Sequence, residues 1–249
     1  MTAAAGPGAR IRAQATFEGR TLLSNGEQLL VSLVLPALAL VGLAISTAPG
    51  LGPGRRIDLA VPGVLALAVV STAFTGQAIS TGFDRRYGVL RLLGTTPLGR
   101  SGLLAGKAIA VLTVVAAQTV LLSALGLAFG WHPQLAGIAV AAVLLILGSA
   151  VWVALALALS GVLRAEATLA VANLIWVLLA AGGGLLVPSD RFPTGVADVI
   201  RLLPSGALGD GLRAALTGHD VSAIGPIVVL LCWGGLGAFL VTRFFRWSD

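Results

Sequence analysis

The only lysine of the chain lies in the stretch that comes nearest to a nucleotide-binding motif. A phosphate-binding loop, G-x-x-x-x-G-K-[ST], needs a glycine six residues before the lysine and a hydroxyl directly after it. Here Ser101 stands at the glycine position and Ala108 follows Lys107. We therefore expect no catalytic residue and no ATP hydrolysis by this chain alone.

Residues for proteolysis or metal chemistry are equally sparse. The nucleophile pattern G-x-S-x-G does not occur. His132 and His219 stand far apart, and Cys232 is the only cysteine, so no cluster of metal-ligand type forms. We expect neither a metal nor a cofactor in this chain. A catalytic role for either histidine is the less favoured interpretation.

The strongest polar groups inside the long apolar stretches are Gln77, Gln118 and Asn173. Amides at membrane depth usually form hydrogen bonds between helices, and this is the favoured interpretation. A place on a substrate path is the alternative. An ion-driven carrier would carry a charge at that depth, and the predicted spans contain none.

Composition predicts an all-α integral membrane protein. Of the 249 residues, 57% are hydrophobic and only 10% are charged, against about 25% in ordinary soluble domains. The mean hydropathy is +0.98. The net charge of +6 comes from arginines between apolar stretches, which suggests membrane topology and no nucleic-acid partner.

Stretches without charged residues predict six membrane-crossing helices, because about 20 apolar residues span a bilayer. They are 28–54 (apolar to Thr47), 59–83, two within 108–163 divided at Trp131-His132-Pro133, 167–189 and 221–242. The whole chain, 1–249, then forms one transmembrane domain. A tail with an interfacial helix (1–27) precedes the spans (28–245), and 246–249 forms the C-terminus.

Basic residues predict the orientation, because Lys and Arg accumulate in cytoplasmic loops. Both termini fall on the richer side, so both are expected in the cytoplasm. That side holds eleven basic residues: Arg10, Arg12, Arg20, Arg85, Arg86, Arg91, Arg100, Lys107, Arg164, Arg243 and Arg246. The other side holds five: Arg55, Arg56, Arg191, Arg201 and Arg213.

Two segments outside the spans are too apolar for plain loops. Residues 10–23 follow an amphipathic pattern, which favours an interfacial helix over a solvated tail. Residues 188–220 are punctuated by Pro188, Pro193 and Pro204, which break helices. We expect two short helices there, 192–203 and 205–216, dipping into the outer leaflet.

The second loop combines apolar and basic residues. Leu90 and Leu93 lie three residues apart, on one face of a short helix predicted over 84–93. Gly94 suits its C-terminal cap, and Thr96-Pro97 suits the start of the third span. A helix resting on anionic lipid is one interpretation. Docking of a cytoplasmic partner is the sharper one.

This loop resembles that of ABC-2 type permeases, the six-span subunits of bacterial drug and polysaccharide exporters. The family pattern resembles E-R-x-x-G-x-L-x-x-L-x-x-T-P-L, followed by Gly-Lys. The matching residues are Arg85, Gly88, Leu90, Leu93, Thr96, Pro97, Leu98, Gly106 and Lys107, with Asp84 at the acidic position. Arg86 replaces a frequent second acid, and Val89 replaces a threonine. Asn25 to Gln28, Pro36, Leu203-Pro204 and Arg213 also look like the family.

The resemblance implies a permease subunit of a bacterial plasma-membrane exporter. Its partners would be two ABC ATPase subunits, which hold ATP and Mg²⁺, a second permease, identical or paralogous, and membrane lipids. The expected cargo is an amphiphile, such as an antibiotic, lipid or glycolipid. The ATPase-coupling interface would comprise Asp84, Arg85, Arg86, Gly88, Leu90, Arg91, Leu93, Thr96 and Pro97. A non-ABC carrier or channel, or a membrane scaffold without transport, remains the alternative.

Overall fold

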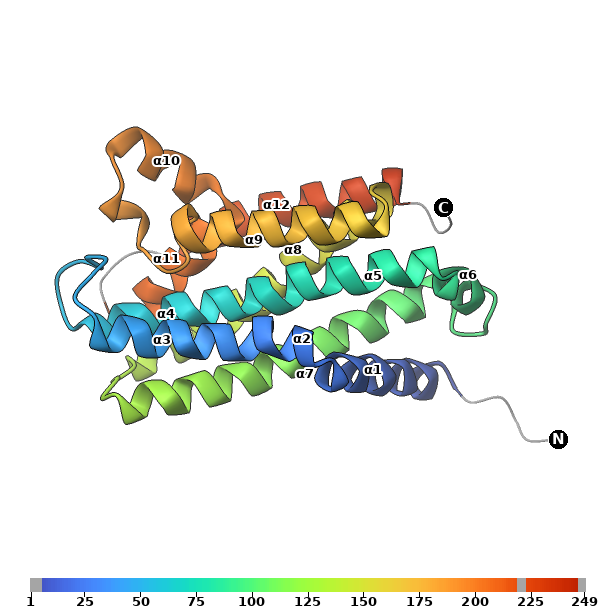
Figure 1. Cartoon of the computed structure of the whole chain (residues 1–249), viewed down its shortest axis with the longest axis horizontal. Coiled ribbons are helices and arrows are strands. Elements are labelled where there is room, and N and C mark those ends of the chain that lie inside the picture. The colour runs from blue at the N-terminus through green and yellow to red at the C-terminus, as the bar shows by residue number, and fades with distance from the viewer. Residues whose placement is uncertain (1–5, 219–222, 246–249) are drawn as a thin grey trace.

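The structure is a computed structural model, and it describes residues 6–218 and 223–245. The described residues form helices, with no strand among them (Figure 1). Residues 7–45 form α1 (Pro7–Ser24), α2 (Gly26–Leu29), η1 (Leu30–Val34) and α3 (Leu35–Ile45). Residues 56–128 form α4 (Arg56–Val69), η2 (Val70–Gly76), α5 (Gln77–Arg86), α6 (Val89–Gly94) and α7 (Gly99–Ala128). The remaining helices are η3 (Leu135–Gly137), α8 (Ile138–Val162), α9 (Ala165–Gly182), η4 (Ser189–Arg191), α10 (Thr194–Leu202), α11 (Pro204–Thr217) and α12 (Ile224–Phe244).

Within the described residues, five helices are long and apolar enough to cross a membrane. They are Arg56–Arg86, Ser101–Ala128, Leu135–Val162, Ala165–Gly182 and Ile224–Phe244. The apolar helix Leu30–Ile45 is shorter. It continues α2 without a break, and a helix over 26–45 is about 30 Å long, the thickness of a hydrocarbon core. The prediction of an all-α membrane protein is confirmed.

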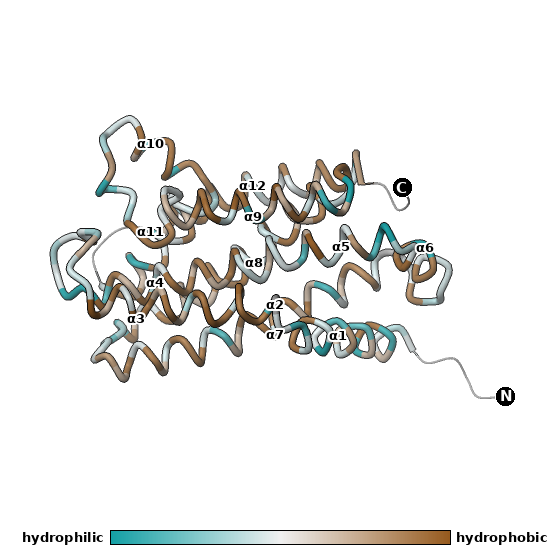
Figure 2. The backbone as a smooth tube through the Cα atoms, in the orientation of Figure 1, coloured by the Kyte–Doolittle hydropathy of each residue, from teal (hydrophilic) through white to brown (hydrophobic). Residues whose placement is uncertain are grey.

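The helix Arg56–Arg86, built from α4, η2 and α5, forms the centre of the bundle. In its most apolar window 89% of residues are buried, whereas only 11% are buried in Ile224–Phe244. The helices α3, α7, α8, α9 and α11 pack around it. The long helices carry apolar residues along their length, while α1 is more hydrophilic (Figure 2). The outer helices thus present exposed apolar side chains at the surface of the bundle, most of all along α12.

Two short helices between α9 and α12 confirm the prediction for 192–203 and 205–216. They are α10 and α11; Leu203 lies between them, and Pro204 is the first residue of α11. The helix α11 is buried against α4, α8 and α12. The Arg213 guanidinium donates to the carbonyl oxygen of Gly184 at 2.8 Å and pairs with Asp210 at 3.1 Å. This end of the bundle is called the α10 end below, and the opposite end is called the α6 end.

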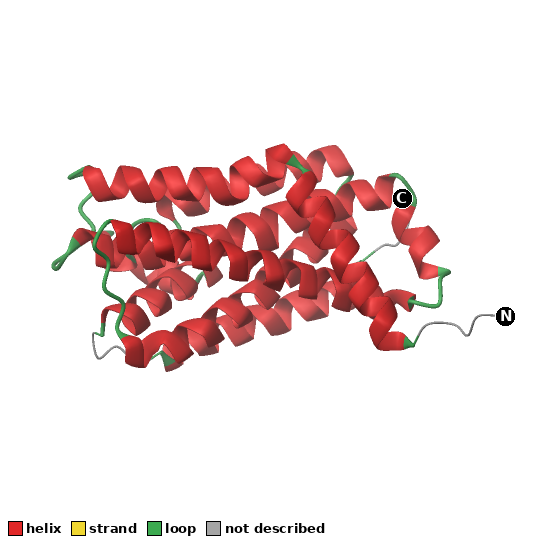
Figure 3. Cartoon of the chain, turned by 90° about the horizontal axis from the view of Figure 1, so that it is seen from below, coloured by secondary structure: helices red, strands yellow, loops and turns green. Residues whose placement is uncertain are grey.

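The predicted amphipathic segment near the N-terminus is a helix, α1. It crosses the bundle obliquely at the α6 end (Figure 3) and packs along α7. Gln14, Ala15, Glu18 and Leu22 form its buried face. The helix therefore docks on protein along one face, a contact that the sequence pattern alone did not indicate.

Some predictions fall outside the described residues. These are the first five residues of the tail, the start of the sixth span at Val221, His219 and the C-terminal segment 246–249 with Arg246. The side chains of Glu27 and Arg100 are likewise outside the description.

Candidate functional site

The connection between α5 and α7 contains two turns and the short helix α6. The predicted helix over 84–93 is divided, because α5 ends at Arg86 and α6 begins at Val89. Between them Gly88 has a φ of 73°, a left-handed conformation that glycine adopts without steric cost. The expected capping by Thr96 is wrong. Its hydroxyl donates to the Leu93 carbonyl oxygen at 2.6 Å, and α7 begins three residues later, at Gly99.

The direction of the α6 side chains corrects the predicted docking face. Leu90 is only 1% exposed, so it packs inside the chain and cannot be part of a docking surface as the protein stands. Leu93 is half-buried, and Arg91 is exposed. The exposed apolar side chains are Tyr87 and Leu92, at 71% and 68%. These two residues, with Arg86 and Arg91, form the surface called the α6 face below.

A buried ion-pair cluster joins three helices beside α6. Lys107, on α7, is 1% exposed, and its Nζ donates to Asp84 Oδ2 at 2.8 Å. The same Nζ lies 2.9 Å from Glu18 Oε1, on α1. Gln14 Nε2 donates to Glu18 Oε1 at 2.9 Å. Burying an ammonium group is costly unless carboxylates surround it, so this cluster holds α1, α5 and α7 together.

The sequence prediction treated Lys107 as a loop residue, and the structure corrects this. Lys107 lies within α7, in the helix Ser101–Ala128. Gly106 precedes it for a steric reason, since a Cβ there would lie 2.6 Å from Gln14 Cγ. The glycine thus lets α1 approach α7, and the lysine pairs with its carboxylate. A lone Lys after Gly, and a Glu on the amphipathic tail, were the available signals for this cluster.

Asp84, Arg85 and Arg86 do not form a common rim. Asp84 points to Lys107. Arg85 is 5% exposed, and it donates to the Ser160 and Leu163 carbonyl oxygens at 2.6 Å each, at the end of α8. Arg86 pairs with Glu166 at the start of α9. The end of α5 is therefore tied to α7, α8 and α9 by three consecutive side chains.

A surface hollow of about 470 Å³ lies between α1 and the turn after α6. Arg10 closes one side of it by donating to the Pro97 carbonyl oxygen at 2.8 Å. The predicted interface residues Leu93, Thr96 and Pro97 meet here. The lining residues are Arg10, Ala13, Gln14, Leu93, Thr96, Pro97 and Leu98. The hollow and the α6 face together form a surface at the α6 end against which another protein could pack.

The candidate substrate-path residues have separate environments. Gln118 Nε2 donates to the Ser32 carbonyl oxygen at 2.8 Å, and Thr72 donates to Gln118 Oε1 at 2.9 Å. The amide thus bridges the π-helical stretches η1 and η2, as the interhelical interpretation expects. Gln77 is fully buried, and its side-chain amide has no hydrogen-bond partner among the described residues. Asn173 is half-buried on α9.

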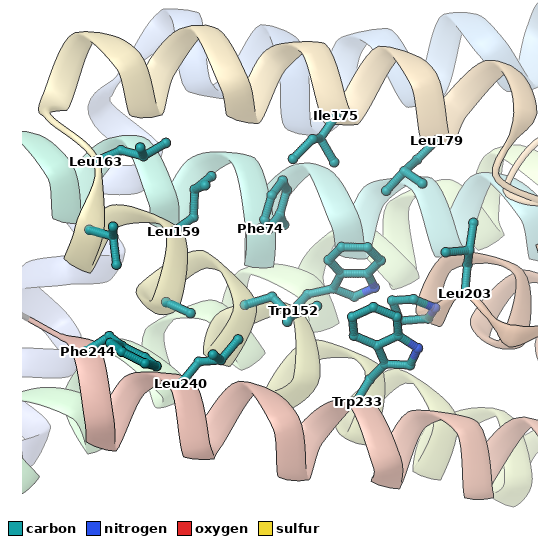
Figure 4. A pocket seen from close by; sticks show the side chains of 14 residues that line it. Phe74, Trp152, Leu159, Leu163, Ile175, Leu179, Leu203, Trp233, Leu240 and Phe244 are labelled. Atoms are coloured by element: carbon teal, nitrogen blue, oxygen red, sulfur yellow. The ribbon is translucent and has the colours of Figure 1, made fainter.

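A long apolar groove lies elsewhere, between α8, α9 and α12, and has a volume of about 510 Å³ (Figure 4). Gln77, Gln118 and Asn173 do not line it. The sequence analysis did not single out any of the residues that do. Apolar groove residues have the same composition as lipid-facing and core residues, so only their arrangement distinguishes them.

Comparison with known families decides which protein class this arrangement represents. The family model described as ABC-2 family transporter protein matches residues 57–244. The chain belongs to the ABC-2 family. Comparison with curated proteins gave no match. This ABC-2 protein is thus a multi-pass membrane subunit of an ABC transporter, a class whose partner is an ABC ATPase subunit.

The matched residues contain the α6 face, Lys107 and the apolar groove, whereas α1 lies before them. The Asp84–Lys107 pair is therefore inside the family region of this ABC-2 protein. The Glu18–Lys107 pair connects that region to the N-terminal helix.

Proposed function

We propose that this chain is the permease subunit of a bacterial plasma-membrane exporter for amphiphilic molecules. Two ABC ATPase subunits would bind ATP and Mg²⁺, and a second permease, identical or paralogous, would complete the translocation path. The observation that carries the proposal is the α6 face. It presents Arg86 at the end of α5, Tyr87 in the following turn, and Arg91 and Leu92 on α6. The end of α5 is tied to several membrane helices. Exposed aromatic and basic side chains of this kind are enriched at protein interfaces.

The mechanism follows from how α6 is held. Closure of an ATPase dimer on ATP would push the α6 face toward the membrane. Asp84, Arg85 and Arg86 connect α5 to α7, α8 and α9, so the push reaches four helices at once. Lys107 also carries it to α1. A packed bundle responds to such a push by shifting between discrete arrangements, which would reorient a cavity from one membrane side to the other.

An amphiphilic cargo is supported by the interior of the bundle. Among the described residues, the central helix is apolar over most of its length, and a charged solute would find few partners there. A drug, lipid or glycolipid would be compatible with such walls. Export is the direction expected from the resemblance to bacterial drug and polysaccharide exporters.

The test is reconstitution with the cognate ATPase. Purified permease alone should hydrolyse no ATP, because the stretch around Lys107 lacks the glycine and hydroxyl of a phosphate loop. The assembled complex in liposomes should hydrolyse ATP faster when a transported amphiphile is added. ATP turnover by the pure permease would contradict the assignment of ATP hydrolysis to separate ATPase subunits. A complex that binds ATPase but never moves or responds to any amphiphile would indicate a scaffold.

The orientation is a separate prediction. With Cys232 replaced by serine, a cysteine placed at Ala9 should resist a membrane-impermeant thiol reagent in intact cells, and one at His132 should react. Both positions are exposed in the structure, so accessibility depends on the side of the membrane. Permeabilised cells provide the control, because both cysteines should then react. Labelling of the Ala9 position alone in intact cells would show that the topology is the reverse of the predicted one.

A further inference from the structure

The apolar groove runs lengthwise along three membrane helices. Side chains from α8, α9 and α12 form its walls, and Phe74 of the central helix lies at its back (Figure 4). Apart from main-chain atoms and two indole nitrogens, its lining is hydrocarbon. The residues that define its two ends are Leu163 and Phe244 at the α6 end, and Leu203 and Trp233 at the other.

The length of the groove matches one leaflet of a bilayer. Along α8 it extends from Trp152 to Leu163, and along α12 from Trp233 to Phe244. Each interval is eleven positions, or about 16 Å at 1.5 Å per helical residue. Half of a 30 Å hydrocarbon core is about 15 Å. The groove therefore covers the leaflet at the α6 end and stops near the middle of the membrane.

The deep end of the groove is closed. Trp233 Nε1 donates to the Leu202 carbonyl oxygen at 2.8 Å, which fixes the indole against the junction of α10 and α11. Leu203 and Pro204, at that junction, form part of the lining. An acyl chain that enters from the α6 end would therefore stop near the membrane centre. The methyl end of a lipid tail in that leaflet lies at the same depth.

The other end of the groove is basic. Leu163 is followed by Arg164, and Phe244 is preceded by Arg243, and both arginines are exposed. Among the described residues neither arginine forms an ion pair, and the nearby Glu166 is paired with Arg86. The Arg243 guanidinium lies over the Phe244 ring, 5.6 Å from its centroid. Phe245 packs on Gly161, which brings the ends of α8 and α12 together.

We propose that this groove holds an acyl chain of an anionic phospholipid from the leaflet at the α6 end, with its phosphate on Arg164 and Arg243. The apolar walls fit the chain, the closed end fits its length, and the basic end fits the headgroup. A helix of a second copy would give no reason for two exposed arginines at one end of the groove. Exposed basic residues next to a membrane helix attract anionic headgroups.

The experiment measures lipid retention by the full-length permease in detergent, using native mass spectrometry. The probes are phosphatidylglycerol, which is anionic, and phosphatidylethanolamine, which is zwitterionic. The parent protein should retain phosphatidylglycerol preferentially. Arg164→Gln/Arg243→Gln should weaken that retention on the order of tenfold, because each basic residue contributes to headgroup attraction. Ala158→Trp, which fills the groove wall, should weaken retention of both lipids.

A matched control removes the same charge from the same end of the bundle. Arg12 and Arg20 are exposed on α1, so Arg12→Gln/Arg20→Gln should retain phosphatidylglycerol like the parent. Equal losses in both double variants would indicate general charge attraction and overturn the site. Unchanged retention after Ala158→Trp would overturn the groove as its location. If Ala158→Trp removes a dimer peak from the mass spectrum but leaves the bound lipid, the groove is the contact site of a second copy. No ATPase is present, so the outcome is independent of the proposed export function.

Discussion

Lys107→Met should destabilise the permease by about 3 kcal/mol and abolish amphiphile-stimulated ATP turnover in the complex. Methionine approximates the length of lysine but carries no charge, so Glu18 and Asp84 would lose their shared cation. Removing one partner of a buried ion pair costs about 3–5 kcal/mol. The lower value applies because the Asp84 side chain is 27% exposed and water can reach it. Thermal unfolding in detergent and ATPase assays in liposomes measure the two effects.

The control for this variant removes the carboxylates as well. Lys107→Met/Glu18→Gln/Asp84→Asn leaves no charge in the cluster, so most of the lost stability should return. Coupling should stay impaired, because α1, α5 and α7 would be joined by weaker neutral contacts. A single Lys107→Met variant as stable as the parent would contradict the cluster. Restored stability together with full ATPase stimulation in the triple variant would show that the charges do not transmit movement.

Tyr87→Asp/Leu92→Asp should detach the ATPase subunit while leaving the permease folded. Both side chains are mostly exposed in this chain, so the change removes few internal contacts. Burial of one leucine side chain is worth about 1.5–3 kcal/mol, and loss of both apolar side chains should weaken association at least about tenfold. Copurification and the ATPase rate measure the effect, and thermal unfolding of the permease alone should be unchanged.

Two control variants test whether the loss of the ATPase is specific to the apolar side chains of the α6 face. Tyr87→Phe/Leu92→Ile keeps the apolar surface and should retain the ATPase. Leu135→Asp places the same kind of change on an exposed leucine at the α10 end, where it should not affect the ATPase. Normal copurification of the Tyr87→Asp/Leu92→Asp variant would refute the docking role of the α6 face. Leu90→Asp is unsuitable here, because Leu90 is buried and its loss would disturb folding.

The sequence could predict those features that depend on composition and on short stretches of chain. Apolar length predicted the membrane helices, since each must by itself match the bilayer thickness. Proline spacing predicted α10 and α11, because Pro193 and Pro204 stand at the starts of these two helices, where a missing N–H has no cost. The loop motif over 84–98 pointed to the ABC-2 family, to which the chain belongs. The ATPase, the cargo and the orientation stay predictions to be tested by the experiments above.

The inner face of α6 could not be derived from its sequence. At 3.6 residues per turn, Val89, Leu90, Leu92 and Leu93 cover about one half of this short helix, with Leu90 and Leu92 at the two edges of that half and Arg91 opposite. Which of them is buried depends on where the neighbouring helices lie. The structure places Leu90 inward and Leu92 outward, and this moves the proposed docking surface to residues that periodicity did not favour.

The sequence by itself thus determined the class of protein, its helices and the loop that marks its family, because bilayer thickness and local backbone chemistry act on each segment separately. Only the tertiary structure decided the partners of Lys107, the bridge made by Gln118 and the presence of a groove between α8, α9 and α12. A buried charge is stable only where carboxylates from distant segments surround it. A groove exists only where neighbouring helices leave a space that their side chains do not fill. Both depend on how segments far apart in the chain meet, which local sequence does not encode.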